Sequence, residues 1–342
     1  MLLPLYFYPM KKSIHVTFFF RKPDDFHFSI EKVFQGIIDH LPEHIKVKKA
    51  ISPYPSQGLK PRLKNLTAVR KQQSQVNHIT GDVHYLALGL PRKNTILTIH
   101  DLGMMNHPNP LARLILWFFW IWWPVRRVKM VTTISEATKK DILKYARCSP
   151  EKARVVPDFL DPNYTFKAKN FNQNQPVILQ IGTKFNKNIE RTLKAIQGVP
   201  CMLWIVGKLT ENHMNLLEEL KISYKNFYRI SNEALKDLYE QCDLLTFCST
   251  LEGFGLPILE AQAIGRPVVT SKISSMPEVG GEGGCCYVDP YDTVSIRKGI
   301  LKVIEEKEFR EQLIQNGLEN VKRFHVYAIA GQYVALYEEI LS

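Results

Sequence analysis

Short apolar runs alternate with amphipathic segments along most of the second half of the chain. The apolar runs are VILQIG (177–182), CMLWIVG (201–207), NFYRIS (226–231), LLTFCS (244–249), PVVTS (267–271) and CCYVDP (285–290). Segments with the helical spacing of apolar residues cover 188–197, 211–221, 232–241, 257–264 and 293–305, and a final helical pair covers 308–342. Short apolar strands between helices predict a parallel sheet with right-handed crossovers, because helices must cover both of its faces.

The first half repeats this alternation less regularly. Apolar or alternating runs predict strands over 13–20, 82–90, 94–102 and 130–135. Helical spacing predicts helices over 29–41 and 136–146, with Ser29 and Ser135 as their N-caps. Between about 157 and 175 the periodicity is lost among prolines and asparagines, which indicates a linker.

The length of 342 residues is too great for one ordinary hydrophobic core and favours two domains. We predict the α/β class, with two facing Rossmann-like domains and a ligand cleft at the carboxyl ends of their strands. Residues 11–165 are assigned to the first domain, 166–325 to the second, and 326–342 to a C-terminal helix that can cross back to the first. Residues 1–10 lack the basic start and the cleavage site of a signal peptide, so we expect the fold to begin near Lys11.

Charge divides the chain unevenly. Residues 1–165 contain 25 Lys and Arg against 12 Asp and Glu, whereas residues 166–342 contain 20 against 21. The net charge of +12 therefore lies in the first half, which favours an anionic partner there, unless it reflects only a basic proteome. The six cysteines include no C-x-x-C pair, which argues against a zinc site or a disulfide scaffold and fits reduced thiols in a cytoplasm.

The stretch LEGFGLPILEAQAIG (251–265) holds two acids, Glu252 and Glu260, around a glycine-containing loop and the start of a helix. Pro257 suits the first helical position, and Gly265 suits the position after the last turn. The loop would then present backbone N–H groups and a helix N-terminus to the cleft. Glu260, one turn into the helix, can face the same cleft and accept two hydrogen bonds from a vicinal diol such as a ribose. The alternative is a capped core helix with two solvated acids.

This stretch, together with the GRPVVTSKISSMPEVGGEGGCCYVDPYD that follows from Gly265, resembles the family 4 retaining glycosyltransferases of the GT-B fold. The resemblance covers most of 176–325. It implies that Glu252 faces the donor sugar and that Glu260 binds the ribose of a nucleotide-sugar. The residues assigned to the donor in this way are Gly182, Thr183, Lys184, Lys187, Ile230, Phe254, Gly255, Leu256 and Glu260.

Two further positions fit the chemistry that the resemblance implies. In LQIGTKFNKNIERTL (179–193) the family places a basic pair that stabilises the leaving diphosphate. Because this loop is short, Lys187 is a safer assignment than Lys184. His100 ends the apolar run of ILTIHDLG, where the family has a His that reaches toward the donor sugar. We assign His100, Glu252 and Lys187 as catalytic, and whether Glu252 also takes part in bond breaking stays open. Solvated lysines and a structural histidine are the alternatives.

The exit of the first predicted strand departs from the family pattern. It reads RKPDD, where family members usually have a Gly-rich loop. Arg21, His27 and the helix N-terminus at Ser29 are candidates to bind an acceptor phosphate. The alternative is that these charges face solvent.

The segment LARLILWFFWIWWPVRRVK (111–129) contains four of the five tryptophans within seven residues. Arg113 interrupts the apolar run and Pro124 ends it, so the run is too short to span a bilayer. Aromatic residues beside cations suit the headgroup interface. We predict a peripheral contact with the inner face of the plasma membrane, made by Trp117, Trp120, Trp122, Trp123, Arg126 and Arg127. The alternative is a buried helix.

We therefore predict a retaining glycosyltransferase that moves a hexosyl or N-acetylhexosaminyl group from a nucleotide-sugar to a saccharide or lipid-linked saccharide in cell-surface polysaccharide assembly. The sequence has no D-x-D motif and no metal-ligand spacing, so we expect no metal, no cofactor and no nucleic-acid partner. The alternatives are a nucleotide-sugar epimerase or a phosphorylase on the same fold, and a basic membrane-binding module without enzymatic activity.

Overall fold

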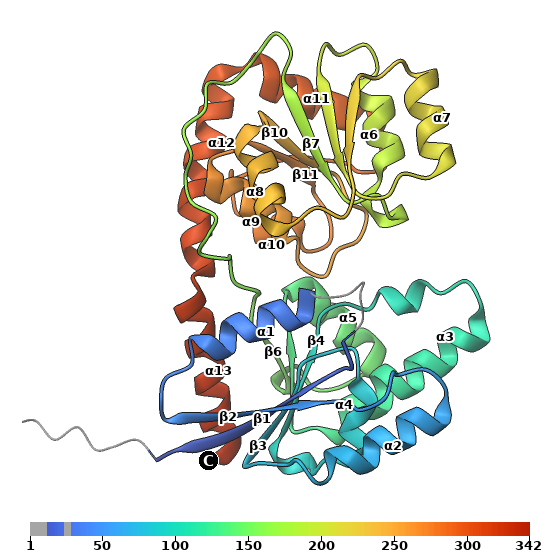
Figure 1. Ribbon diagram of the computed structural model, residues 1–342, viewed down its shortest axis with the longest axis vertical. Helices are drawn as coiled ribbons and strands as arrows, with labels where there is room; N and C mark the ends of the chain where they lie inside the picture. The colour runs from blue at the N-terminus through green and yellow to red at the C-terminus, as the bar shows by residue number, and fades with distance from the viewer. Residues whose placement is uncertain (1–11, 24–28) are drawn as a thin grey trace, which may run out of the picture.

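The computed structural model describes residues 12–23 and 29–342, which form two α/β halves, one above the other in Figure 1. Residues 1–11 and His27 lie outside the described residues, so the predictions about the chain start and about His27 are not addressed by it. A parallel sheet forms the centre of each half, with helices on both of its faces. The predicted α/β class with two Rossmann-like domains is confirmed.

The first sheet has the strand order β2-β1-β3-β4-β5-β6, with every pairing parallel. Its strands are β1 (Ile14–Phe20), β2 (Ile45–Ile51), β3 (Val76–Ile79), β4 (Thr95–Ile99), β5 (Met130–Thr133) and β6 (Ala153–Val155). The central strands β3, β4 and β5 are buried along their whole length, as expected for a parallel sheet covered on both faces. Their carboxyl ends form the floor of the cleft described below.

The helices of the first half differ in how clearly the sequence predicts them. They are α1 (Ser29–Asp39), α2 (Leu59–Val69), α3 (Pro110–Leu116), α4 (Trp123–Arg127) and α5 (Glu136–Ala146). The predictions for 29–41 and 136–146 are confirmed within two residues. Ser135 caps α5 as expected, since its hydroxyl accepts a hydrogen bond from the Thr138 N–H.

The second sheet has the order β12-β11-β10-β7-β8-β9 and is also parallel. Its strands are β7 (Val177–Ile181), β8 (Met202–Val206), β9 (Tyr224–Phe227), β10 (Leu244–Phe247), β11 (Val268–Ser271) and β12 (Cys286–Val288). Its helices are α6 (Ile189–Ile196), α7 (Glu211–Glu219), α8 (Asn232–Gln241), α9 (Leu256–Ile264), α10 (Met276–Gly280), α11 (Thr293–Glu305) and α12 (Lys307–Asn320). Most of these elements coincide with the predicted segments.

The chain passes between the two halves twice. Residues 156–176, all of them described, form no helix or strand and lead from β6 to β7. After α12 the last helix, α13 (Val326–Leu341), returns to the first half, where Figure 1 shows it along the flank of the first sheet. There the Tyr337 hydroxyl lies 2.8 Å from His78 Nδ1, and His78 Nε2 lies 2.8 Å from the Thr98 hydroxyl. Burial lowers the pKa of His78 to about 3, so this imidazole is neutral and structural.

Two strand predictions are wrong. The run DVHYLALGL forms a 3-10 helix over His84–Gly89 instead of a strand. Asp82 adopts a left-handed conformation with φ 61° after Gly81, and this turn ends the extended chain. His84, Tyr85, Leu86 and Ala87 are then all buried, so the apparent alternation does not mark two faces. The strand predicted over 226–231 ends at Phe227, which leaves Ile230 in a loop.

Candidate active site

A cavity of about 380 Å³ lies where the carboxyl ends of the two sheets meet. The first half contributes Arg21, Asp82, His100, Asp101 and Asp158, and the second half contributes Lys184, Glu252 and residues 253–257, which end in the first turn of α9. Parallel sheets bind ligands at this end. The structure thus brings together residues from both halves that the sequence assigned to the reaction.

Direct contacts join the two halves beside this cavity. The Ser135 hydroxyl donates a 2.7 Å hydrogen bond to the Gly253 carbonyl. The Glu136 N–H, at the start of α5, donates to both carboxylate oxygens of Glu278 at 2.9 Å. A Cβ at Gly253 would lie 2.4 Å from the His100 carbonyl oxygen, so only glycine permits this approach. The loop that carries Glu252 is therefore held against the first half.

Glu252, which lines the cavity, forms an ion pair with Lys187. Lys187 Nζ lies 2.7 Å from Glu252 Oε1, and the two side chains are 19% and 13% exposed. Asn186 Nδ2 donates to the same oxygen at 3.3 Å, and Lys187 Nζ lies 4.6 Å from the centre of the Phe247 ring. The ammonium is thus held by one carboxylate and an aromatic face, with a side still open to solvent.

The loop after β7 is shaped to hold Lys187. Gly182 has φ 86°, and a Cβ there would lie 2.9 Å from Lys187 Cγ. The chain then makes a 3-10 turn over Phe185–Lys187 before α6. Lys184 is exposed and lines the same cavity, whereas the Thr183 hydroxyl donates to the Lys208 carbonyl at 2.7 Å. Gly182 makes room for the lysine stem, and Lys187 approaches Glu252 more closely than Lys184 does.

The start of α9 forms the base of the second-half wall. Gly255 has φ 116° and precedes Leu256, with Pro257 in the first turn. Phe254 is buried, and Ser275 Oγ donates to its carbonyl at 2.7 Å. The first N–H groups of a helix lack intrahelical partners, and Gly255, Leu256 and Pro257 line the cavity. This end of α9 therefore offers an anion-binding wall beside the Lys187–Glu252 pair.

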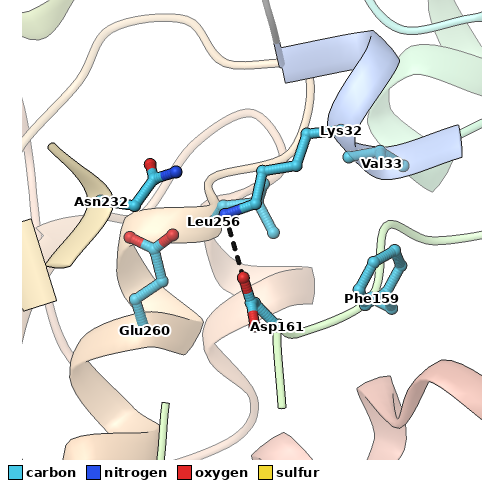
Figure 2. A pocket seen from close by; sticks show the side chains of 7 residues that line it. All are labelled: Lys32, Val33, Phe159, Asp161, Asn232, Leu256 and Glu260. Carbon is cyan, nitrogen blue, oxygen red and sulfur yellow. Dashed lines mark ion pairs between the residues drawn. The ribbon is translucent and has the colours of Figure 1, made fainter. Parts of the chain in front are cut away.

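Glu260 lies in a second cavity of about 440 Å³, drawn in Figure 2. Both cavities are lined by Val33 and Leu256, so they adjoin at the start of α9. Figure 2 shows the Glu260 carboxylate on α9, with the Lys32–Asp161 ion pair beside it in the same cavity. Ile230 lies two residues before Asn232, which also lines this cavity. A ligand longer than one cavity can therefore reach from Glu252 to Glu260.

One oxygen of the Glu260 carboxylate has a fixed partner. The Tyr239 hydroxyl donates a 2.7 Å hydrogen bond to Glu260 Oε2. Burial raises the pKa of Glu260, while the hydrogen bond from Tyr239 and the nearby Lys32 charge oppose that rise. Glu260 Oε1 stays available for a ligand, because a carboxylate has several acceptor sites.

His100 lies on the first-half side of the cavity. Its Nε2 is 2.8 Å from the Thr80 carbonyl oxygen, which can only accept, so a neutral His100 has its proton on Nε2 and a lone pair on Nδ1. With Nε2 bonded to the protein, the ring can accept a hydrogen bond from a hydroxyl group at Nδ1. The assignment of His100 to the donor sugar stays a prediction.

Arg21 does not present an unmatched charge to the cavity. Its Nε lies 2.7 Å from Glu31 Oε1, and its Nη1 also pairs with Asp82. Although burial opposes it, the contacts with Glu31 and Asp82 raise the pKa of Arg21. Because two carboxylates already neutralise the guanidinium, this environment disfavours the predicted binding of an acceptor phosphate.

The aromatic segment does not expose all of the residues that were predicted to contact a membrane. A π-helical turn over Trp117–Trp122 joins α3 to α4. Trp120 is buried and its indole N–H donates to the Asp82 carbonyl at 2.8 Å, so the prediction for Trp120 is wrong. The Trp117 N–H donates to the Tyr145 carbonyl, and the Arg126 guanidinium stacks 4.0 Å from the Trp122 ring. An indole N–H needs an acceptor when it leaves water, and here the protein supplies it.

The exposed apolar face of this segment comprises other residues. From α3 to the first residue of α4, the exposed large apolar side chains are those of Leu111, Leu114, Ile115, Phe119 and Trp123, which we call the apolar stripe. Arg127 and Lys129 are exposed just after it. Within the described residues, no helix is both long and apolar enough to cross a membrane.

Sequence reasoning missed several residues that build the site, among them Lys32, Asp158, Asn186, Tyr239 and Ser274. Ser274 donates to the Glu252 carbonyl at 2.9 Å and so fixes the loop that carries the acid. A tyrosine on an amphipathic helix or a serine in a loop gives no distinguishing signal in a single sequence. Of these residues, only Asn186 is next in the sequence to a predicted site residue, Lys187.

Both halves of the chain match known protein families. Residues 10–164 match the family model described as Glycosyltransferase Family 4, and residues 163–320 match the one described as Glycosyl transferases group 1. The O-antigen chain mannosyltransferase RfbU of Salmonella typhimurium is 28% identical over 244 residues, which cover 68% of this chain and 68% of that protein. The O-antigen chain mannosyltransferase B of Escherichia coli is 27% identical over 284 residues, covering 75% and 72%.

Solved structures share the architecture at lower identity. The crystal structure of Alr3699/HepE from Anabaena, in complex with UDP and glucose, superposes with a TM-score of 0.73 at 16% identity. The superposition covers 95% of this chain and 100% of the Anabaena chain. At such low sequence identity, the comparison shows that the two proteins share a fold.

Proposed function

The chain belongs to the family 4 glycosyltransferases, which have the GT-B fold. From this membership we propose that it transfers a hexosyl or N-acetylhexosaminyl group from a nucleotide-sugar. We propose that the transfer retains the configuration of the sugar and needs no metal ion. The observation that carries the proposal is the pair of adjoining cavities at the start of α9, with Glu252 in one and Glu260 in the other. This arrangement suits a donor whose sugar and ribose are separated by a diphosphate.

In the proposed complex, Glu260 accepts hydrogen bonds from the ribose hydroxyls while Tyr239 holds its other oxygen. The diphosphate lies at the N-terminus of α9, and Lys187 stabilises the negative charge that develops on it. As the bond between the anomeric carbon and the phosphate oxygen breaks, the acceptor hydroxyl attacks from the same face and gives its proton to the departing diphosphate. Attack from the face of the leaving group retains the configuration.

The names of the relatives support a sugar acceptor. Two of them are O-antigen chain mannosyltransferases, and the Anabaena structure holds UDP and glucose. We propose that this chain likewise extends a saccharide or a lipid-linked saccharide in the assembly of a cell-surface polysaccharide. The first-half wall of the cavity, with its carboxylates Asp82, Asp101 and Asp158, suits a hydroxyl-rich acceptor better than a phosphorylated one.

A panel of nucleotide-sugars tests the proposed function. UDP-glucose, GDP-mannose and ADP-glucose are each added to the full chain, and the melting temperature is recorded. A ligand at 100 times its Kd stabilises the folded state by about 2.7 kcal/mol, so the preferred donor is expected to raise the melting temperature by several degrees. Radiolabelled sugar from that donor is then expected to appear in an oligosaccharide acceptor. Conversion of the donor without an acceptor would support an epimerase instead, and stabilisation by no donor would contradict both.

We further propose that the apolar stripe rests on an anionic membrane surface and brings the site to a lipid-linked acceptor. Figure 1 shows α3 on the outer flank of the first half, opposite α13. An exposed apolar helical face followed by cations is typical of a helix that lies in the headgroup region. Lys and Arg outnumber Asp and Glu by 25 to 12 in residues 1–165, which adds attraction to anionic lipids.

The triple variant Leu111→Ser, Leu114→Ser, Ile115→Ser is expected to lose membrane binding. Each substitution removes about 1 kcal/mol of apolar transfer energy. The three together remove about 3 kcal/mol, so the partition coefficient should fall roughly 100-fold. The measurement is flotation with phosphatidylglycerol-containing vesicles at low and high salt. The matched control is Met214→Ser with Val294→Ser, which removes exposed apolar side chains from the second half. Equal flotation of the two variants would exclude the stripe as the contact.

A further inference from the structure

Asp158 is a carboxylate of the first-half wall for which the proposed reaction names no individual contact. It follows β6 in the segment that leaves the first sheet, and it is 6% exposed. It lines the same cavity as His100 and Glu252. Within residues 12–23 and 29–342, no hydrogen bond reaches its carboxylate. Its side chain is therefore buried in the protein, and a ligand can reach it only through the cavity.

The residues around Asp158 give no structural reason for a buried carboxylate at this position. Ile134, Phe254 and Val33 also line this cavity. Burial and the Asp158 charge raise the pKa of the Tyr333 hydroxyl, but no hydrogen bond joins these two described side chains. Burial in these surroundings raises the pKa of Asp158. A buried polar group without a partner costs stability, and such groups concentrate where a ligand supplies the missing hydrogen bond.

The charges around the cavity indicate which ligand group fits. On the first-half wall Asp82 and Asp101 accompany Asp158, and the Arg21 charge is already matched by Glu31 and Asp82. This wall repels a phosphate but offers acceptors to O–H donors. His100 Nδ1, which has a lone pair in the tautomer set by Thr80, adds another acceptor of the same kind.

We propose that Asp158 is a further catalytic residue that binds a hydroxyl group of a substrate sugar through its carboxylate. The inference rests on the proposed glycosyl transfer. The hydroxyl group belongs either to the sugar that is transferred or to the attacking acceptor, since both meet in this cavity. In either case the hydrogen bond fixes the position of the reacting sugar against Glu252 and Lys187.

The variant Asp158→Asn tests this, with Asp39→Asn as the matched control, because Asp39 is an exposed aspartate of the same half that lies outside the cavity. Dissociation constants are measured for the preferred nucleotide-sugar and for its free nucleoside diphosphate, together with kcat and the acceptor KM. We expect kcat/KM to fall roughly 10- to 100-fold in Asp158→Asn and to stay unchanged in Asp39→Asn. The affinity for the free nucleoside diphosphate should stay unchanged in both.

The separate constants distinguish the two sources of the hydroxyl group. Weaker binding of the nucleotide-sugar assigns the contact to the transferred sugar, whereas a raised acceptor KM with unchanged donor binding assigns it to the acceptor. Monodeoxy analogues give a second readout, because Asp158→Asn should cause no further loss with the analogue that lacks the contacted hydroxyl group. A purely structural residue would lose activity equally with every analogue.

Stability gives a third readout. Replacing a buried carboxylate without a partner by a neutral amide is expected to keep or raise the melting temperature, as is common for functional residues. The proposal is overturned if Asp158→Asn both lowers the melting temperature and weakens the binding of the nucleoside diphosphate. It is also overturned if every kinetic and dissociation constant of Asp158→Asn equals that of Asp39→Asn. If the unaltered chain and Asp39→Asn transfer no sugar, the proposed function itself fails and this inference fails with it.

Discussion

Replacing Lys187 by Met is expected to lower kcat by about 100- to 1000-fold, the range seen when one preorganised group that stabilises transition-state charge is removed. Lys187 is the cation closest to Glu252, at 2.7 Å, and it is held in place by the Phe247 ring and by the space that Gly182 leaves. The diphosphate gains further negative charge as the sugar leaves, so Lys187 stabilises the transition state more than the bound donor, and the donor KM should change less than kcat. Steady-state kinetics with the preferred donor measure both constants.

The matched control is Lys184→Met in the same loop. Lys184 lines the cavity but is exposed and has no ion pair in the described part of the chain, so we expect a loss below about tenfold. The double variant Lys187→Met, Glu252→Gln should be little worse than Lys187→Met alone, because the two side chains form one unit. A larger effect at Lys184 than at Lys187 would contradict the assignment of the catalytic cation.

Most of the second half of the fold could be predicted from sequence because its strands, apart from the polar edge strand β9, are apolar on both faces. Strand β10, for example, is LLTF and buried throughout, so it stands out from the amphipathic helices around it. In the first half, β2 reads IKVKKAI and lies at the edge of the sheet, with one side toward solvent. Helix α2 carries lysines and an arginine, together with the exposed leucines Leu59 and Leu63. Neither segment shows the periodicity that marks a buried element, and both were missed.

The candidate site divides in the same way. Glu252, Glu260 and Lys187 lie in local motifs, where the order of strand, loop and helix start determines which end of the sheet they reach. Other residues of the site lie outside these motifs. Tyr239 reaches Glu260 from another helix, and Asp158 reaches the cavity from the other half of the chain. Such contacts depend on tertiary packing, which a single sequence does not encode in any local pattern.

The aromatic segment shows a further limit of sequence patterns. Composition predicted an interfacial helix, but it could not tell which side of the helix faces outward. The π-helical turn over Trp117–Trp122 changes the residues per turn and rotates Trp120 into the protein. The exposed stripe therefore comes mainly from the aliphatic side chains that precede the tryptophans.

Replacing Glu260 by Gln is expected to raise the donor KM by roughly 10- to 100-fold, because hydrogen bonds to a charged group contribute about 1.5–3 kcal/mol. The carboxylate lies in the second cavity with one oxygen held by Tyr239. Tyr239→Phe should therefore raise the donor KM in the same direction but less, since it frees the carboxylate without removing it. Glu240→Gln is the control, because Glu240 pairs with Lys236 on the surface of α8.

A donor with a 2′-deoxyribose separates ribose binding from a general effect on the cavity. The unaltered chain should bind this donor more weakly than the ribose form, whereas Glu260→Gln should discriminate between the two donors much less, because the partner of the missing hydroxyl is already gone. Competition assays with both donors measure the coupling. If Glu260→Gln weakens the binding of the deoxy donor as strongly as the binding of the ribose donor, the carboxylate contacts some other part of the ligand. The placement of the ribose in the second cavity is then wrong.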